Sequence, residues 1–342
     1  PHKVHKLSEF VNFVRPDPNE TKRTTMKKVI LKPGKEKPLQ HRHHWIFSGA
    51  ISSFPQCEPG EIMEVYDSNN EQVGCAYFNK RTSIAGRMIS FGKEDPYESI
   101  RASLERAISL RKHVIDTSHT TAYRLFNGEG DYIPGLVIDR YNDILVIQAY
   151  TAGIERLKPF LLEELQRLLP ECTTIYEKSR LTCRKEEGLK EQEQVLVGEI
   201  PTYTNVKENG ITFAITIPDS QKTGFFLDQR EMRHLVKTLS KGKRVLNCFS
   251  YSGGFSLYAL AGGASHVTSV DVSKKAIDLA KKNTELNGYE EADHTLICAD
   301  VFDVLEEDSI DYDIVILDPP AFAKKKGDIK NATRGYRGIN LR

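Results

Sequence analysis

The sequence predicts a multi-domain fold with three parts: a small β-barrel, an α+β middle domain and a Rossmann-like α/β domain. The length is the first reason, because 342 residues exceed what one compact core usually holds. The second reason is a series of short strands with alternating polarity after Lys27. The third is a run of apolar strands after Arg244 that alternate with helical patterns, as in a parallel sheet covered by helices.

The pattern of elements also predicts the domain boundaries. Residues 1–26 are polar and interrupted by proline, which is typical of an extension outside a folded domain. The domains that follow are a barrel at 27–95, a connecting helix at 96–117, a middle α+β domain at 118–217 and the α/β domain at 218–342. Asp95 and Pro96 mark the start of the connecting helix, since aspartate suits the N-cap and proline the first turn.

Individual elements follow from the same patterns. Strands are expected in the barrel at 28–31, 61–66, 74–78 and 83–88, and in the middle domain at 136–139, 144–149, 174–178 and 194–198. A helix is expected within 154–169, where Pro159 obscures its first turn.

Composition excludes several classes of protein. Lysine plus arginine is 48 and aspartate plus glutamate is 47, so a polyanionic partner must be met by a local patch. The six cysteines form no Cys-x-x-Cys pair, which argues against a disulfide framework and a structural zinc, and we expect no metal. No apolar run approaches eighteen residues. The expectation is a cytoplasmic protein with no membrane partner.

The α/β domain carries carboxylates at the ends of successive strands. The strand at 244–249 runs into a turn that contains Gly253, and the strand at 267–270 ends in Asp271. Strands at 295–298 and 314–317 are followed by Asp300 and Asp318. Because parallel strands end at one edge of a sheet, these groups are expected to meet there. Asp271 lies eighteen residues past Gly253, where an acidic side chain can accept hydrogen bonds from ribose hydroxyls.

The glycine turn favours a cofactor that contains adenosine without phosphate. A dinucleotide site needs Gly-x-Gly-x-x-Gly, whose amides face a pyrophosphate. This turn has only the pair Gly253-Gly254, between bulky Tyr251 and Phe255. S-adenosylmethionine therefore fits better than a nicotinamide dinucleotide, although a strand-turn-helix without ligand is the alternative for the turn alone.

A basic and aromatic stretch at the start of the barrel suggests nucleic-acid binding. Lys32, Lys35, Arg42, His43 and Trp45 lie close together in the sequence. Basic side chains interleaved with aromatic ones suit a phosphate backbone with unstacked bases. The alternative is a solvated basic edge strand that prevents aggregation.

With these motifs in view, residues 28–342 closely resemble the bacterial 23S ribosomal RNA cytosine-carbon-5 methyltransferases of the RlmI type. The motifs that carry the resemblance lie at 42–49, 127–135, 222–230, 247–255 and 318–322. The resemblance implies a PUA domain for RNA, a middle α+β domain and a class I methyltransferase domain that uses S-adenosylmethionine. It also implies large-subunit ribosomal RNA as the partner, and a homodimer is compatible with the sequence.

The resemblance also implies a set of site residues. Asp318 is expected to position the target base. The cofactor-binding residues are expected to be Thr223, Gln229, Arg230, Asn247, Phe249, Ser250, Gly253, Asp271, Val272, Asp300, Val301 and Asp318.

One expected group has no counterpart in this sequence. Methylation of cytosine at carbon 5 needs a nucleophile that adds at carbon 6, usually a cysteine. The family carries that cysteine, and further strands, after Asp-Pro-Pro, so we expect both beyond Arg342 and an incomplete methyltransferase domain here. Cys248 and Cys298 lie within predicted strands and are expected to be buried. Two alternatives stay open: methylation of an amino group, which needs no cysteine, and an RNA-binding protein with a catalytically incomplete cofactor fold.

Overall fold

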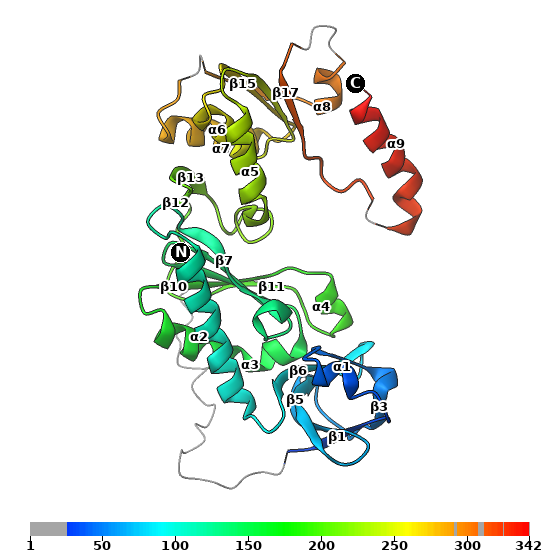
Figure 1. Cartoon of the computed structure of the whole chain (residues 1–342). Helices are drawn as coiled ribbons and strands as arrows, with labels where there is room; N and C mark the ends of the chain where they lie inside the picture. The colour runs from blue at the N-terminus through cyan, green and yellow to red at the C-terminus, as the bar shows by residue number, and fades with distance from the viewer. Residues whose placement is uncertain (1–25, 291–292, 307–310, 324, 342) are drawn as a thin grey trace, which may run out of the picture. The chain divides into compact units, whose positions relative to one another are not determined.

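The computed structural model describes residues 26–290, 293–306, 311–323 and 325–341 (Figure 1). The predicted N-terminal extension therefore lies almost wholly outside the described residues. The chain divides into two compact units, residues 1–96 and 97–342.

The first unit is built on one six-stranded sheet with the order β2-β6-β5-β4-β1-β3. Its strands are β1 (Lys28–Leu31), β2 (Trp45–Phe47), β3 (Ile51–Ser53), β4 (Glu61–Tyr66), β5 (Gln72–Phe78) and β6 (Ile84–Phe91), with the short helix α1 (Lys37–Gln40) between β1 and β2. The four strands predicted here are confirmed. Strands β2 and β3 were missed, since three residues give too short an alternation to recognise.

Alternation of side chains produces the core of this unit. Val29 and Leu31 of β1 and Met63 and Val65 of β4 lie on one side of their strands and are fully buried, whereas their neighbours in sequence are less buried. This period of two is what a half-buried strand requires. Strands β1 and β4 run parallel, so their apolar residues meet in one cluster with Phe78 of β5.

The second unit begins with α2 (Pro96–Val114), which confirms the predicted connecting helix. A five-stranded sheet follows with the order β11-β10-β9-β8-β7. Its elements are β7 (Ala122–Asn127), β8 (Leu136–Tyr141), β9 (Ile144–Ala149), α3 (Ala152–Leu168), β10 (Thr174–Ser179), α4 (Cys183–Glu186) and β11 (Gln192–Val197). Only β7 and α4 were not predicted. Helix α3 starts two residues earlier than expected, because Thr151 caps it and Pro159 is accommodated inside it.

The rest of this unit holds a hairpin and a parallel sheet with helices. The hairpin is β12 (Thr204–Glu208) and β13 (Ile211–Ile215), and the sheet has the order β16-β15-β14-β17. The sheet strands are β14 (Arg244–Cys248), β15 (His266–Asp271), β16 (His294–Cys298) and β17 (Ile314–Leu317). The helices are α5 (Arg230–Leu239), α6 (Gly254–Ala261), α7 (Lys274–Leu286), α8 (Val301–Val304) and α9 (Ile329–Asn340). All four sheet strands were predicted, whereas the hairpin, α5 and α9 were not.

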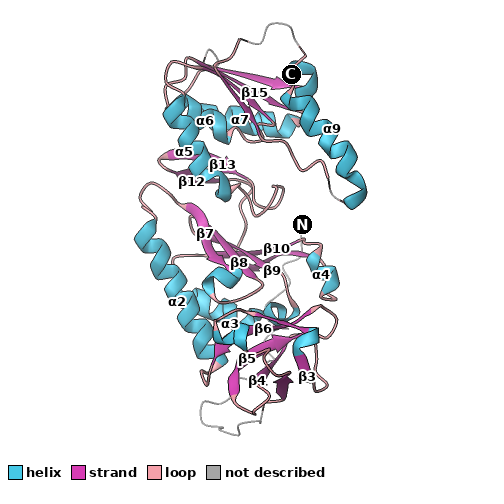
Figure 2. Ribbon diagram, turned by 45° about the vertical axis from the view of Figure 1, so that its right-hand side comes forward, coloured by secondary structure: helices cyan, strands magenta, loops and turns pink. Residues whose placement is uncertain are grey.

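Helices cover both faces of the parallel sheet. Figure 2 shows α6 and α7 side by side next to β15. Along β14, Asn247 faces this layer and bonds to Ser256 of α6. Leu246 and Cys248 instead pack with residues of α8 and with Ile339 of α9. The alternation confirms the Rossmann-like arrangement, in which a parallel strand is buried on both sides.

The hairpin is fixed to the α/β layer by buried polar groups. Asn283 of α7 accepts a hydrogen bond from the Ala214 amide at 2.7 Å. Glu208 of β12 is fully buried and pairs with Arg233 of α5 through two bonds of 2.7 Å. This buried ion pair fixes the hairpin against α5, because replacing either residue would leave the other as a buried, unpaired charge.

Candidate functional site

The candidate site lies where the four parallel strands end. Pairing of β14 with β15 and β17, and of β15 with β16, is parallel throughout. Residues that follow the strands are therefore brought to one edge of the sheet. Asp271, Asp300 and Asp318 lie at this edge, as the sequence predicted. Such an edge is where open α/β sheets bind ligands.

The turn after β14 has an unusual backbone. Phe249, Tyr251 and Gly253 alternate in the left-handed region with φ values of 56°, 46° and 77°. Bulky residues are rare there, and such strain is characteristic of ligand sites. Gly253 is the N-cap of helix α6, and a Cβ atom at this position would lie 3.1 Å from the Cβ atom of Ala280. The turn can therefore approach α7 closely only with glycine at this point.

Asp271 holds this turn in place. Its Oδ2 atom accepts a hydrogen bond from the amide of Tyr251 at 2.9 Å, and its Oδ1 atom accepts one from the amide of Ser273 at 2.9 Å. A carboxylate offers about four acceptor positions. Two positions therefore stay available for a ligand's hydroxyl groups, and the protein has already fixed their direction.

Two further residues at this edge fit an adenosine-containing cofactor. The Oγ atom of Ser250 is buried and is without a hydrogen-bond partner among the described residues. A buried hydroxyl usually has a partner, so this atom suits a polar group of a ligand. Val272, next to Asp271, is 74 % exposed and gives apolar surface suited to a purine face. The residues present therefore fit S-adenosylmethionine.

Three predicted site residues have their side chains turned into the core. Asn247 is buried and donates a hydrogen bond to Ser256. Val301 is buried in the cluster that includes Leu246, and Phe249 packs against the same cluster. Asn247 and Val301 can therefore meet a cofactor only through the backbone, whereas Phe249 is partly exposed.

The segment before α5 lies beside the turn. Phe226 makes an edge-to-face contact with Tyr251, with ring centroids 5.6 Å apart. The predicted residues Gln229 and Arg230 follow at the start of α5 and are half-buried. Thr223 is almost fully buried, and its hydroxyl is bonded to Asp139 and Tyr141 of the middle sheet. The structure thus brings Thr223 near the site but directs its side chain elsewhere.

Asp300 and Asp318 have different surroundings. Asp300 caps α8 by accepting a hydrogen bond from the Phe302 amide at 2.8 Å. Asp318 is exposed just after β17 and before the Pro319-Pro320 pair, where a base could reach it. Phe322 packs on Tyr336 of α9 with ring centroids 4.6 Å apart.

The two cysteines of this domain differ from each other. Cys248 is buried as expected, and burial raises the pKa of its thiol to about 11. The expectation that Cys298 is buried was wrong, because β16 is an edge strand and Cys298 is its last residue. Its Sγ atom lies 3.6 Å from the carbonyl oxygen of Val272, at the cofactor side of the edge.

The predicted RNA-binding residues all lie in the first unit. Lys32 and Lys35 are exposed, and Lys32 also donates a hydrogen bond to the Gly49 carbonyl. Trp45 is 38 % exposed and packs edge-to-face against His43 at 5.8 Å. Phe47, which was not among the predicted RNA-binding residues, is half exposed beside Trp45 on β2. Its alternation with Trp45 along a short strand could have indicated it.

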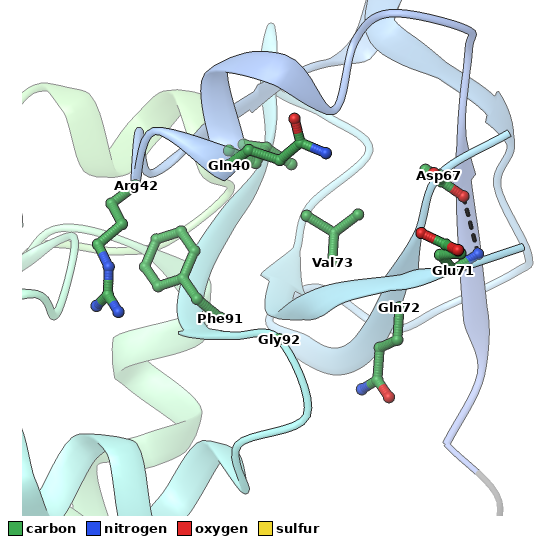
Figure 3. Close-up of a pocket in the computed structure, with 9 residues that line it drawn as sticks. Gln40, Arg42, Asp67, Glu71, Gln72, Val73, Phe91 and Gly92 are labelled. Atoms are coloured by element: carbon green, nitrogen blue, oxygen red, sulfur yellow. Dashed lines mark hydrogen bonds between the residues drawn. The ribbon is translucent and has the colours of Figure 1, made fainter. Parts of the chain in front are cut away.

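Arg42 belongs to a neighbouring hollow of the same unit. Its guanidinium lies 5.5 Å from the centre of the Phe91 ring (Figure 3). The hollow has a volume of about 380 Å³ and is lined by Leu39, Gln40, Arg42, Asp67, Glu71, Gln72, Val73, Phe91 and Gly92. An arginine stacked on a ring at the rim of a polar hollow is chemistry that suits a base or a phosphate.

The described residues contain neither a candidate metal centre nor a candidate membrane-spanning helix. Across residues 26–341, apart from the gaps given above, no cluster of histidine, cysteine, aspartate and glutamate could hold a metal ion. Within the same residues, no helix has the length and apolar character needed to cross a membrane.

Comparison with known proteins agrees with this geometry. A family model described as S-adenosylmethionine-dependent methyltransferase matches residues 124–342, and a model of a PUA-like domain matches residues 29–91. Ribosomal RNA large subunit methyltransferase I from Aliivibrio fischeri is 41 % identical over 320 residues, which is 92 % of this chain and 81 % of the relative. The protein of that name from Photobacterium profundum is 42 % identical over 321 residues, with the same coverage.

The chain belongs to the ribosomal RNA large subunit methyltransferase I family. The resemblance seen in the motifs is thereby confirmed, as is the use of S-adenosylmethionine.

Solved structures support the family fold. A methyltransferase crystallised with SAH has a TM-score of 0.74 and 30 % identity, covering 88 % of this chain and 78 % of the other. A methyltransferase from Streptococcus mutans has a TM-score of 0.73 and 28 % identity, with 91 % and 82 % covered. The multi-domain fold with a PUA-like part and a methyltransferase part is that of the family.

Proposed function

We propose that this family member methylates carbon 5 of a cytosine in large-subunit ribosomal RNA. The observation that carries the proposal is the joint presence of a PUA-like unit with exposed basic and aromatic residues and a methyltransferase edge built around Asp271. The domain division given above is part of the proposal, and so are the site residues other than Thr223, whose hydroxyl is bonded to the middle sheet. A cytoplasmic location follows from the RNA substrate, and a homodimer stays a prediction.

S-adenosylmethionine supplies an electrophilic methyl group on a sulfonium. Asp271 would accept hydrogen bonds from the ribose hydroxyls with the two acceptor positions that Tyr251 and Ser273 leave available. Val272 would contact the adenine, and the Ser250 hydroxyl would gain the partner it lacks. These contacts orient the cofactor before the base arrives, which is how binding energy contributes to rate.

Asp318 would position the base. Its carboxylate is exposed after β17, which pairs with β14 at one end of the described four-strand order. A carboxylate accepts hydrogen bonds from the exocyclic amine of cytosine and thereby distinguishes it from uracil.

The nucleophile is not assigned to Cys248 or Cys298. Cys298 ends β16, which is three strands from β17, and at about 4.8 Å per strand this separation is roughly 14 Å. Cys248 pairs with Leu317 of β17 but faces the helix layer, and its raised pKa of about 11 leaves little thiolate at neutral pH. The expectation of a nucleophile beyond Arg342 is therefore retained as part of the proposal.

The experiment is methyl transfer from labelled S-adenosylmethionine to large-subunit ribosomal RNA, followed by digestion to nucleosides. The full-length protein should place the label in 5-methylcytidine, and small-subunit ribosomal RNA serves as the control substrate. Label in an amino-methylated nucleoside would replace this proposal by methylation of nitrogen. Cofactor and RNA binding without transfer would favour the RNA-binding alternative.

A further inference from the structure

The segment 217–226 runs from the β12–β13 hairpin to the turn beside the cofactor edge, and the middle sheet holds its first part. Lys178 of β10 is buried, and its ammonium group donates to the carbonyls of Ile217 and Ser220 at 2.5 and 2.7 Å. It also donates to the Ser220 hydroxyl at 2.8 Å. Three donors thus meet three acceptors, so the ammonium group is fully paired.

The middle sheet also holds the next residues of this segment. The Thr223 hydroxyl lies 2.6 Å from Oδ2 of Asp139, which also accepts two hydrogen bonds from Arg124. A carboxylate paired with arginine accepts only, so Thr223 donates its single proton to Asp139. Tyr141 must then donate to Thr223, at 2.9 Å, while its oxygen accepts from the Phe225 amide at 3.2 Å. The donor and the acceptor of each hydrogen bond in this buried set are therefore fixed.

Backbone packing brings the segment against the same tyrosine. Gly224 has φ = +151°, and a Cβ atom built on it would lie 3.2 Å from Cζ of Tyr141. The segment can therefore lie flat on the Tyr141 ring only with glycine at this position. Hydrogen bonds to Thr223 and Phe225 lie on either side of this contact.

The other end of the segment reaches the cofactor edge. Phe226 packs against Tyr251, whose amide is bonded to Asp271. Arg233 donates to the Phe226 carbonyl at 3.0 Å. A displacement of the segment at Thr223 would therefore shift Phe226, three residues later. Phe226 contacts Tyr251 and so supports the strained turn.

We propose that Asp139, Tyr141 and Thr223 form a clasp through which the middle domain positions the turn that holds the cofactor. Thr223 is a positioning residue in this arrangement. Its hydroxyl donates its one proton to Asp139 and accepts from Tyr141, so it has no proton to donate to a ligand. The middle domain thereby sets cofactor affinity without touching the cofactor. The inference rests on the proposed cofactor site at Asp271.

The test compares four variants of the full protein. Thr223→Val removes the hydroxyl and keeps the shape, and Thr223→Ser keeps the hydroxyl. Tyr141→Phe removes the second member of the clasp while its ring still supports Gly224. Thr174→Val is the matched control, because Thr174 is also buried in the middle sheet and donates one hydrogen bond, to the Glu199 carbonyl at 2.8 Å, outside the segment.

The first readout is the dissociation constant of S-adenosylhomocysteine by calorimetry. Thr223→Val and Tyr141→Phe should each raise it at least roughly fivefold to tenfold, because each removes two buried hydrogen bonds of the clasp. Thr223→Ser and Thr174→Val should stay within about twofold of the wild type. Equal affinity in all variants would overturn the proposal, and so would a loss in Thr223→Ser as large as in Thr223→Val.

The second readout is cleavage by trypsin after Lys222, which needs no cofactor. Lys222 is exposed and directly precedes Thr223, so release of the clasp should speed cleavage there in Thr223→Val and Tyr141→Phe but not in Thr174→Val. Unchanged cleavage in both variants would refute the clasp. If the wild-type protein failed to bind S-adenosylhomocysteine, the proposed cofactor site would be wrong, and the clasp would be judged on cleavage alone.

Discussion

The carboxylate of Asp271 bonds to the amide of Tyr251 at 2.9 Å, across twenty residues of sequence. Through this contact one side chain both shapes the strained turn after β14 and presents its remaining acceptor positions to a ligand. Loss of the carboxylate is therefore expected to affect the turn and the ligand together.

Asp271→Ala should weaken binding of S-adenosylhomocysteine by ~2–3 kcal/mol, because a paired acceptor for two ribose hydroxyls is lost. Asp271→Asn should lose less, since the amide oxygen can still accept from one donor. Calorimetry on both variants checks this order. The same affinity in Asp271→Ala and the wild-type protein would contradict the assignment of the ribose site.

The two cysteines of the methyltransferase domain should react at very different rates. Iodoacetamide at pH 8 should modify exposed Cys298 and leave Cys248 intact, because burial raises the Cys248 pKa to about 11. Bound S-adenosylhomocysteine should slow alkylation of Cys298, whose sulfur lies beside Val272.

Mass spectrometry of the alkylated peptides measures both rates in one sample. Cys183 is exposed and lies in the middle domain, so its rate serves as an internal reference that the ligand leaves unchanged. Equal protection of Cys183 and Cys298 would indicate a general change in the protein and not a cofactor next to Val272.

His294 should make stability depend on pH. It lies in a buried chain of hydrogen bonds, in which Nε2 contacts Ser269 at 2.7 Å and Nδ1 contacts Thr284 at 2.8 Å. Thr284 donates to the Ala280 carbonyl, so Nδ1 of His294 carries the proton and Nε2 accepts. Burial, with a smaller effect of His266, lowers the His294 pKa from 6.5 to about 4.

A lowered pKa means that the folded state keeps His294 neutral where the unfolded chain would bind a proton. Its contribution is therefore fully present above pH 6.5 and is lost as the pH falls towards 4, by about 3 kcal/mol in total. Urea unfolding between pH 8 and pH 4.5 measures this loss. His294→Gln should show a flatter profile, and parallel profiles for the two proteins would contradict the assignment.

The basic residues of the first unit should determine the salt dependence of RNA binding. Replacing Lys32, Lys35 and Arg42 by glutamine should lower affinity and reduce the log–log salt slope by about one unit per lost phosphate contact. Replacing Lys112, Lys190 and Lys207, exposed lysines of the second unit, removes the same number of charges and should leave the slope nearly unchanged. A slope unaltered by the first replacement would mean that these residues only face solvent.

The sequence by itself determined the elements with strong local patterns. The four parallel strands, the middle-sheet strands β8 to β11 and helix α2 each have an apolar period or a cap within a few residues, so their positions followed without any tertiary information. The same holds for Asp271 and Gly253, because strand ends and turns are fixed by local sequence. The hairpin β12–β13 was missed, since its buried Glu208 breaks the apolar pattern and is tolerated only through Arg233.

Tertiary structure alone decided what each side chain contacts. Thr223 was predicted to bind the cofactor, but its hydroxyl is hydrogen-bonded to Asp139 and Tyr141. These residues lie 84 and 82 positions earlier in the sequence. Cys298 was expected to be buried, but its strand is at the edge of the sheet. Strand order and contacts between distant residues depend on how elements pack, and packing free energy is not encoded within any one element. A local pattern can therefore predict that a residue lies at the site, but not which way its side chain is turned.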